Sequence, residues 1–294
     1  MIDFVFDGNS LFARSWYAAQ SSGESNPDEY AVEIAHSLVF GLMDSRNDRI
    51  GVKPDRTLFC WDTTQKKDKE RTPKPPEYHE AIRSFRKSLT QLIGAAHAKI
   101  EGHESDDLVA TAAYSIPESH EVYVISGDKD LQQLQGGNIK YYCLNQKQVL
   151  SRMAILSRWK VKRPSQIALA LAIIGDSGDR IPGIKGWGPK KAEKLFEYVD
   201  PDMDFKEAMD AITAHMPPKA HQEFMESLEL TLLQPDIPDV PEPNVVTPCS
   251  ASEAYDLTTG KATNAFLRLR TLYVDTGADD AALINSLESE NWDP

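Results

Sequence analysis

The sequence predicts an α/β fold: a mostly parallel central sheet flanked by helices. Three hydrophobic, β-favouring runs, residues 2–6, 57–61 and 121–125, each lead into an aspartate within a few residues. Longer segments with helical spacing of apolar residues lie between and after them, at 31–44, 79–96 and 106–114. Alternating strands and helices are typical of a parallel sheet with helices on both faces. In such sheets, functional groups gather at the carboxyl ends of the strands.

The pattern changes after about residue 152, where helical segments are separated by turns that contain glycine and proline. The segments 164–174 and 190–198 have helical character. Residues 235–248 include five prolines and few apolar side chains, which is typical of an extended linker. We therefore expect three parts: an α/β core over 1–151 with an insertion near 63–97, a helical region over 152–235, and an acidic C-terminal extension over 236–294.

The composition is that of an ordinary globular protein of 294 residues, with 41% hydrophobic side chains. No apolar run is long enough to span a membrane, and the first residues do not resemble a secretory signal, so a cytoplasmic protein is expected. The three cysteines, Cys60, Cys143 and Cys249, have no Cys-x-x-Cys spacing. We expect them to be reduced and mostly buried, without a disulfide or a zinc site.

The formal net charge of −13 is unfavourable for a protein that binds nucleic acid. The charge is, however, unevenly distributed. Residues 66–87 contain eight basic and four acidic side chains, and residues 180–194 contain five and one, whereas residues 235–294 contain eleven acidic and three basic side chains. The acidic balance is largely a property of the C-terminal extension, so positive surfaces can exist elsewhere.

Nine carboxylates stand out because each follows a strand or belongs to a tight acidic cluster: Asp7, Asp62, Glu104, Asp106, Asp107, Asp128, Asp130, Asp176 and Asp179. Three of them fall at a predicted helix start, where the first-turn amides favour negative charge, and a simple helix cap is an alternative there. The pairs at 128/130 and 176/179 lie in turns with glycine, for which ordinary Asx-turns are the alternative.

The joint occurrence of these acids favours a metal site, because carboxylates gathered in one cleft would repel one another unless cations neutralised them. Ligands that offer only oxygen select hard ions such as Mg²⁺ or Mn²⁺. Two such ions about 4 Å apart can activate water and stabilise the attacking and leaving oxygens of a phosphoryl displacement. The sequence therefore predicts a phosphodiester hydrolase that uses two metal ions.

Six short motifs in this order resemble the 5′-nuclease family, which includes flap endonucleases, 5′-3′ exonucleases, the nuclease domain of bacterial DNA polymerase I and free-standing bacteriophage enzymes. They span roughly residues 3–198 and are Phe6-Asp-Gly-Asn-Ser-Leu11, Asp62, Arg71 with Pro76-Glu-Tyr78, Gly102-His-Glu-Ser-Asp-Asp107, Ser126-Gly-Asp-Lys-Asp-Leu131, and Gly175-Asp-Ser-Gly-Asp-Arg-Ile-Pro-Gly183 with the following Ile184-Lys-Gly-Trp-Gly-Pro-Lys190.

The resemblance implies a PIN-like core, a helical arch and a helix-hairpin-helix motif that binds DNA. It implies that the first metal is held by Asp7, Asp62, Glu104, Asp106 and Asp107, and the second by Asp128, Asp130, Asp176 and Asp179. It also implies a K⁺ ion at the hairpin motif. The residues expected to contact DNA are Arg71, Lys74, Arg86, Gly186, Gly188, Lys190 and Lys191. The glycines would let the backbone approach phosphate, beside two lysines at a helix start.

The arch departs from the pattern of the family, because His79 stands where many relatives have lysine and Arg83 falls one residue later than usual. Tyr78 could stack on a base, and His79 or Arg83 could stabilise the charge of the scissile phosphate.

The resemblance implies a monomeric nuclease that acts at 5′ ends, flaps or junctions of DNA, or on RNA primers, during replication or repair. Its location would be the cytoplasm, or the host cytoplasm if the protein is viral. Two alternatives stay open: a DNA-junction binding protein without activity, and an RNA-directed, single-strand-specific nuclease.

Overall fold

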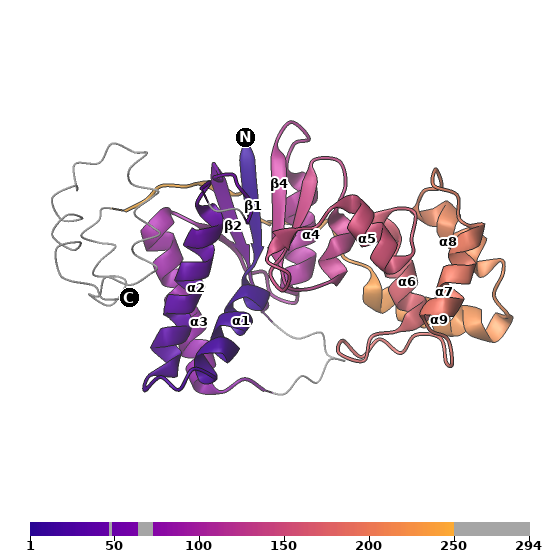
Figure 1. Ribbon diagram of the computed structural model, residues 1–294, viewed down its shortest axis with the longest axis horizontal. Coiled ribbons are helices and arrows are strands. Elements are labelled where there is room, and N and C mark those ends of the chain that lie inside the picture. Colours follow the sequence, from indigo (N-terminus) through magenta and orange to yellow (C-terminus); the bar gives the residue numbers. More distant parts are fainter. Residues whose placement is uncertain (47–48, 64–72, 250–294) are drawn as a thin grey trace.

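The computed structural model describes residues 1–46, 49–63 and 73–249 and has the expected α/β architecture (Figure 1). The strands are β1 Ile2–Asp7, β2 Arg56–Cys60, β3 Ala96–Ala98, β4 Glu121–Ser126, β5 Ile139–Cys143, β6 Gln148–Val149 and β7 Asn244–Val245. The α-helices are α1 Gly8–Gln20, α2 Pro27–Met43, α3 Pro76–Ile93, α4 Ser105–Ser115, α5 Arg152–Trp159, α6 Ile167–Ile174, α7 Pro189–Leu195, α8 Phe205–Thr213 and α9 Pro218–Thr231. Short 3₁₀ turns lie at Asp130–Leu134, Pro164–Gln166 and Phe196–Tyr198.

The sheet has the order β3-β2-β1-β4-β5-β6, with β1 near its centre. The strands β3, β2, β1, β4 and β5 are parallel, and only β6 and β7 pair antiparallel with their neighbours β5 and β2. Asp7 pairs with Cys60 in the register of β1 and β2, and Phe6 pairs with Ile125 of β4. The three strand ends that precede acidic residues therefore meet at one edge of the sheet.

Alternation along the strands divides the hydrophobic core between the two faces of the sheet. Phe4 and Phe6 face a layer formed by α1, α2 and α3, whereas Val5 faces α4 and the helical region. The hydrophobic core on the Val5 face continues from the sheet into α6 and α9. These two helices pack on each other at the right of Figure 1. The carboxyl edge of the sheet is thus supported from both faces.

An insertion in the form of an arch was expected near residues 63–97. Where the structure describes this segment, it belongs to the core layer and does not form a separate arch. Residues 64–72 lie outside the described part of the chain, and α3 is amphipathic and packs into the core. Tyr78, Phe85 and Leu89 are buried against α1 and α2. Helical spacing of these apolar residues explains why α3 belongs to the core layer.

The expected linker over 235–248 also contains more structure than its prolines suggest. Its residues Asn244–Val245 form β7, which pairs with Thr57 and Arg56 at the beginning of β2. A strand of two residues is too short to produce a periodic signal in the sequence. The remainder of the C-terminal extension, 250–294, lies outside the described residues.

Two further expectations can be compared with the described residues. All three cysteines are free in the structure, with Cys60 and Cys143 buried and Cys249 partly buried, which agrees with the expected burial. No helix in the described ranges has both the length and the apolar character needed to cross a membrane.

Candidate active site

Asp7 is the centre of the carboxylate cluster because it ends the central strand and caps the next helix. Its Oδ1 accepts hydrogen bonds from the backbone N–H of Ser10 at 3.0 Å and the hydroxyl of Ser105 at 3.2 Å. Its Oδ2 accepts from the hydroxyl of Ser126 at 2.6 Å. The carboxylate is buried, with 4% of the residue exposed. Three elements, α1, α4 and β4, therefore fix its orientation.

Asp62 lies beside Asp7, two residues after β2. Its Oδ1 accepts from the backbone N–H of Ser105 at 2.7 Å, and its Oδ2 accepts from the amide of Asn9. The amide oxygen of Asn9 in turn accepts from the backbone N–H of Asp62 at 3.1 Å. Ser105 thus bridges the two carboxylates at the start of α4.

The electrostatics of Asp7 show that negative charges crowd at this edge. The pKa of Asp7 is raised to about 6. Burial is the largest cause and the charges of Asp128 and Asp62 act in the same direction, whereas hydrogen bonds from Ser126 and Ser10 act in the opposite direction. A nearby positive charge would favour the ionised form of this carboxylate.

A second acidic group follows β4. The backbone N–H of Asp130 donates to Oδ1 of Asp128 at 2.9 Å, and the Ser126 hydroxyl accepts from the backbone N–H of Asp128 at 2.9 Å. The pKa of Asp130 is raised to about 8, mainly by burial and also by the charges of Asp128 and Asp179. Among the residues that the structure describes, the buried Oδ1 of Asp130 has no hydrogen-bond partner.

Asp176 reaches this group from the helical region. Lys129 donates a hydrogen bond to Oδ2 of Asp176, and the Gly178 N–H donates to its Oδ1 at 2.9 Å. Burial alone would raise the pKa of Asp176, but these interactions outweigh burial and lower it. The charges of Asp130 and Asp179 also act on Lys129, so this ammonium lies among three carboxylates.

The loop that presents Asp176 depends on a close backbone approach. Residues Asp176 and Ile181 exchange two backbone hydrogen bonds of 2.8 Å. Gly183 has a φ of +64°, and a Cβ at this position would lie 2.5 Å from the backbone N of Gly175. Only glycine fits there without displacement, so the loop requires this residue.

The chemistry of these residues fits hard divalent cations. The cluster offers only oxygen ligands, contains a buried carboxylate oxygen without a partner, and holds acids whose pKa values are raised by burial and mutual repulsion. Within residues 1–46, 49–63 and 73–249, no three Asp, Glu, His or Cys side chains are arranged as a group that could hold a metal ion.

The three acids at the start of α4, Glu104, Asp106 and Asp107, have different surroundings. Glu104 is buried at the N-cap position, next to Ser105. Asp107 instead accepts the backbone N–H of Gln234 at 2.9 Å, and Thr111, one turn later, binds the carbonyl of the same residue at 3.1 Å. This contact joins Asp107 to the chain after α9, and the metal-ligand role expected for Asp107 from the sequence stays a prediction. Asp106 accepts the backbone N–H of Asp107 at 2.8 Å.

The arch residues are divided between the surface and the core. His79 and Arg83 are exposed on α3. Tyr78 is only 5% exposed and packs edge-on against Phe12 and Trp16, so in this structure its ring has no open face on which a base could stack.

The remaining basic residues expected near the arch lie close to aromatic rings where they are described. Lys74 donates to the hydroxyl of Tyr17, and the guanidinium of Arg86 lies 5.4 Å from the ring of Trp61, next to Asp62. Arg71 lies outside the described residues.

Lys99 is a cation that the sequence analysis missed. It is exposed and directly follows β3, another strand whose carboxyl end faces this edge. Its pKa is lowered by burial and by the charges of Arg86 and Arg83, while Asp62 acts in the opposite direction. Lys99 is therefore within electrostatic reach of Arg86, Arg83 and Asp62. The strand of three residues that precedes Lys99 gave too little signal to identify it.

The glycine-rich loop before α7 is open to solvent. No atom lies within 4 Å of a Cβ placed at Gly186 or Gly188, and Lys190 and Lys191 are exposed. The ammonium of Lys191 lies 4.8 Å from the ring centre of Trp187. The loop thus presents a positively charged surface to one side of the carboxylates.

Comparison with known proteins identifies 5′-3′ exonucleases and DNA polymerase I proteins as relatives. Residues 3–160 match the family model described as "5′-3′ exonuclease, N-terminal resolvase-like domain". DNA polymerase I of Rhizobium leguminosarum is 31% identical over 214 residues, which are 68% of this chain and 21% of that protein. The 5′-3′ exonuclease of Aquifex aeolicus is 26% identical over 205 residues, which are 66% and 68% of the two chains. The chain thus spans only about a fifth to 29% of the DNA polymerase I relatives that it matches.

Solved structures share the fold. The T5 D15 protein co-crystallised with metal ions superposes with a TM-score of 0.57 at 17% identity, covering 93% of this chain and 99% of that one. The catalytic core of Rad2 in complex with DNA substrate gives a TM-score of 0.56 at 12% identity, covering 91% and 92%. With more than half of its residues matched by the family model, the chain belongs to the 5′-3′ exonuclease family.

Proposed function

We propose that the protein is a structure-specific 5′ nuclease, with 5′-3′ exonuclease and flap endonuclease activity, that hydrolyses DNA phosphodiesters with two divalent metal ions. The observation that carries this proposal is the meeting of two carboxylate groups at one edge of the sheet: Asp7 with Asp62, and Asp128 and Asp130 with Asp176. The relatives named 5′-3′ exonuclease support the same reaction.

The two groups would hold one ion each, preferably Mg²⁺ or Mn²⁺. Asp7, Asp62, Glu104, Asp106 and Asp107 would hold the first, and Asp128, Asp130, Asp176 and Asp179 the second. The ions would activate water and stabilise the charge on the departing oxygen. A K⁺ ion at the loop around Gly186 is part of the same proposal.

The protein's own residues would orient the carboxylates and the substrate. Ser105 and Ser126 hold Asp7 in place, and thereby fix the position of its oxygens before any ligand arrives. Lys99 lies in the field of Asp62 and near Arg83, and these two cations could bind the scissile phosphate, with His79 on the same helix as Arg83. Lys190 and Lys191 could bind the phosphate backbone beyond the site.

The substrate would be DNA with 5′ ends, flaps or junctions, and RNA primers on DNA would be accepted at the same surface. We further propose that the protein acts as a monomer in the cytoplasm, or in the cytoplasm of a host cell.

The test is cleavage of a 5′-labelled flap on a DNA duplex, with Mg²⁺ or with a chelator, by the wild type and by Asp128→Ala. We expect metal-dependent products near the junction that the variant does not form. Asp210→Ala is the matched control, because Asp210 is exposed and pairs with Lys206 far along the chain from the cluster. Activity should be unchanged in this control.

Other outcomes would contradict the proposal. A wild type that binds the flap but leaves it intact with every divalent ion would indicate a junction-binding protein. Cleavage of single-stranded RNA, with DNA flaps left intact, would indicate an RNA-directed nuclease.

A further inference from the structure

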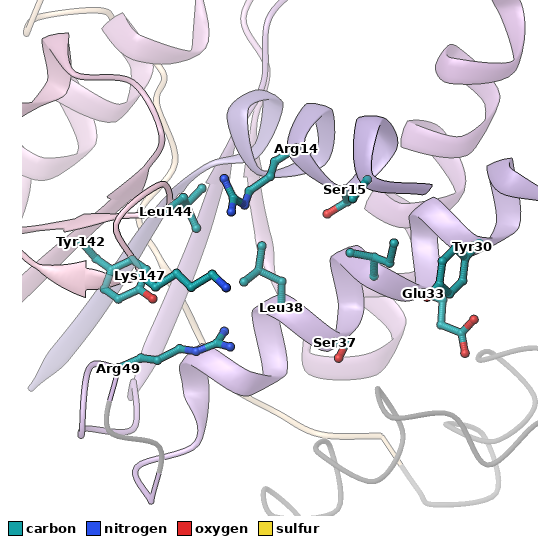
Figure 2. A pocket seen from close by; sticks show the side chains of 12 residues that line it. Arg14, Ser15, Tyr30, Glu33, Ser37, Leu38, Arg49, Tyr142, Leu144 and Lys147 are labelled. Carbon is teal, nitrogen blue, oxygen red and sulfur yellow. The ribbon is translucent and has the colours of Figure 1, made fainter. Parts of the chain in front are cut away.

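A pocket of about 310 Å³ lies apart from the carboxylate cluster, between α1, α2 and the turn that joins β5 to β6. Figure 2 shows the side chains around it, including Arg14, Arg49, Lys147, Leu38 and Tyr30. None of the carboxylates assigned to metal binding lines this pocket. Its size is at the lower end of the range for small-molecule sites, so it suits a ligand of the size of one nucleotide.

Three cations from distant parts of the sequence meet at one end of the pocket. Arg14 comes from α1, Arg49 follows α2, and Lys147 lies in the β5–β6 turn, and their nitrogen atoms point into the same space (Figure 2). The hydroxyl of Tyr142 lies near them: burial raises its pKa, while the charges of Arg49 and Arg14 act in the opposite direction. Converging guanidinium and ammonium groups are typical of phosphate sites.

The backbone of Lys147 is in the left-handed region, with a φ of +55°. This conformation is unfavourable for a residue that carries a Cβ and is usually occupied by glycine or asparagine. The N–H of Lys147 closes the turn on the carbonyl of Cys143 at 2.8 Å. This turn holds the side chain of Lys147 so that it points into the pocket (Figure 2).

The other end of the pocket has a different character. Leu38 and Ile34 form an apolar wall along α2, and beyond them lie the ring of Tyr30 and the carboxylate of Glu33 (Figure 2). An aromatic ring can stack on a base, and a carboxylate can accept a hydrogen bond from an exocyclic amine. The pocket thus offers cations for a phosphate at one end and an aromatic ring and a carboxylate for a base at the other.

We propose that this pocket binds one nucleoside 5′-monophosphate unit, with its phosphate at Arg14, Arg49 and Lys147 and its base beside Tyr30. The unit would be either a free mononucleotide or the terminal nucleotide of a DNA strand. The inference goes beyond the proposed nuclease function, because binding at this pocket requires neither metal nor cleavage.

The pocket is connected to the candidate active site by hydrogen bonds. Arg14 donates to Oδ1 of Asn145 at 2.9 Å, and the Asn145 amide donates to the carbonyl of Gly127 at 2.9 Å. The N–H of Gly127 donates to the hydroxyl of Ser10 at 3.0 Å. Substitution of Arg14 would therefore disturb the turn before Asp128, so Lys147 and Arg49 are the better positions to test.

The experiment is calorimetric titration of the full chain with dAMP and with inorganic phosphate, in the presence of chelator. We expect wild-type binding that weakens about tenfold or more in Lys147→Gly and in Arg49→Gln, because each loses a charge-assisted hydrogen bond. Tyr30→Ala should weaken dAMP binding more than phosphate binding.

Lys160→Gly is a matched control for Lys147→Gly. Lys160 is also a lysine with a positive φ, +58°, but it caps α5 outside this pocket. Both glycine variants relieve backbone strain and remove one charge, and both should have a Tm no lower than the wild type. Only Lys147→Gly should lose nucleotide affinity.

The proposal would be overturned if the wild type failed to bind millimolar dAMP, or if Lys160→Gly lost as much affinity as Lys147→Gly. A competition experiment distinguishes a free mononucleotide from the terminal nucleotide of a DNA strand as the natural ligand. The competitors are a linear 5′-phosphorylated oligonucleotide and the same oligonucleotide closed into a circle. Displacement of dAMP by the linear strand alone supports a DNA terminus, and displacement by neither supports a free mononucleotide. Displacement by the circle would overturn the proposal in favour of contacts with internal phosphates. Because chelator is present throughout, these results are independent of whether the flap is cleaved.

Discussion

The buried imidazole of His36 should make the stability of the protein depend on pH. His36 lies on α2, is 2% exposed and shares a 2.7 Å hydrogen bond with the Ser88 hydroxyl of α3. Its ring stacks on Phe40 at 5.8 Å and lies 5.1 Å from Phe85. Burial lowers its pKa from 6.5 to about 3. The folded protein therefore keeps this side chain neutral over a range of pH in which the unfolded chain protonates it.

The direction of the effect follows from this difference. Below pH 6.5 the unfolded state takes up a proton that the folded state does not, so stability is lost as the pH falls from 6.5 towards 3. Each pH unit in this window costs about 1.4 kcal/mol. At pH 5 the loss from His36 alone is about 2 kcal/mol, a large part of the free energy of unfolding of a typical domain.

The measurement is urea unfolding at several pH values between 5 and 7.5 for the wild type and His36→Asn. Other groups also titrate in this range, including Asp7, so the informative quantity is the difference in pH dependence between the two proteins. We expect the variant to be less stable at pH 7.5 but to lose about 2 kcal/mol less on going to pH 5. His221→Asn, at an exposed histidine, is the control. Equal pH dependence in the wild type and His36→Asn would refute this reasoning.

Two further substitutions test the loop and the charges at the candidate active site. Gly183→Ala should lower the free energy of unfolding by more than Gly186→Ala, by about 1 kcal/mol or more, because both have a positive φ but only a Cβ at Gly183 meets backbone atoms; equal losses in chemical unfolding would contradict the loop geometry. Lys129→Met should lower the Tm of the metal-free protein and increase the rise in Tm produced by Mg²⁺, because it removes the ammonium among Asp176, Asp130 and Asp179; a rise equal to that of the wild type would show that this ammonium does not compete with the ion.

The sequence predicted the carboxyl edge of the sheet well, because its signal is local. Asp7 and Asp62 directly follow β-favouring runs, and strands of one parallel sheet bring such positions together whatever the details of packing. The alternation of strands and helices was also sufficient for the fold class, since few topologies satisfy it.

The roles of individual acids could not be predicted in the same way. Ser105 and Asp107 are two residues apart on α4, so their side chains lie on different sides of the helix. Ser105 donates a hydrogen bond to Asp7, and Asp107 accepts one from Gln234. Which side of a helix start faces the site depends on the packing of α4 against the sheet. A cluster of acids in sequence is therefore weaker information than an acid at a strand end.

Tyr78 and the pocket beside α2 show a second limit. The sequence places Tyr78 among basic residues, but its helical spacing with Phe85 and Leu89 puts it on the core face. Arg14, Arg49 and Lys147 are separated by up to 133 positions, and no local pattern connects them. Only the tertiary arrangement brings such groups together.

The buried acids of the candidate active site lower the stability of the fold but suit the binding of divalent cations. Asp7 and Asp130 are buried acids whose raised pKa values weaken the fold once the pH exceeds the value of an unfolded aspartate, because the unfolded chain releases the proton more readily. Hydrogen bonds from Ser10, Ser126 and Ser105 offset part of this cost at Asp7, whereas Oδ1 of Asp130 has no such partner. Lys129 supplies only one positive charge to the second group. An arrangement that is unfavourable alone and becomes favourable with divalent cations is what a metal-dependent site requires, so the instability of the acidic edge is itself an argument for its function.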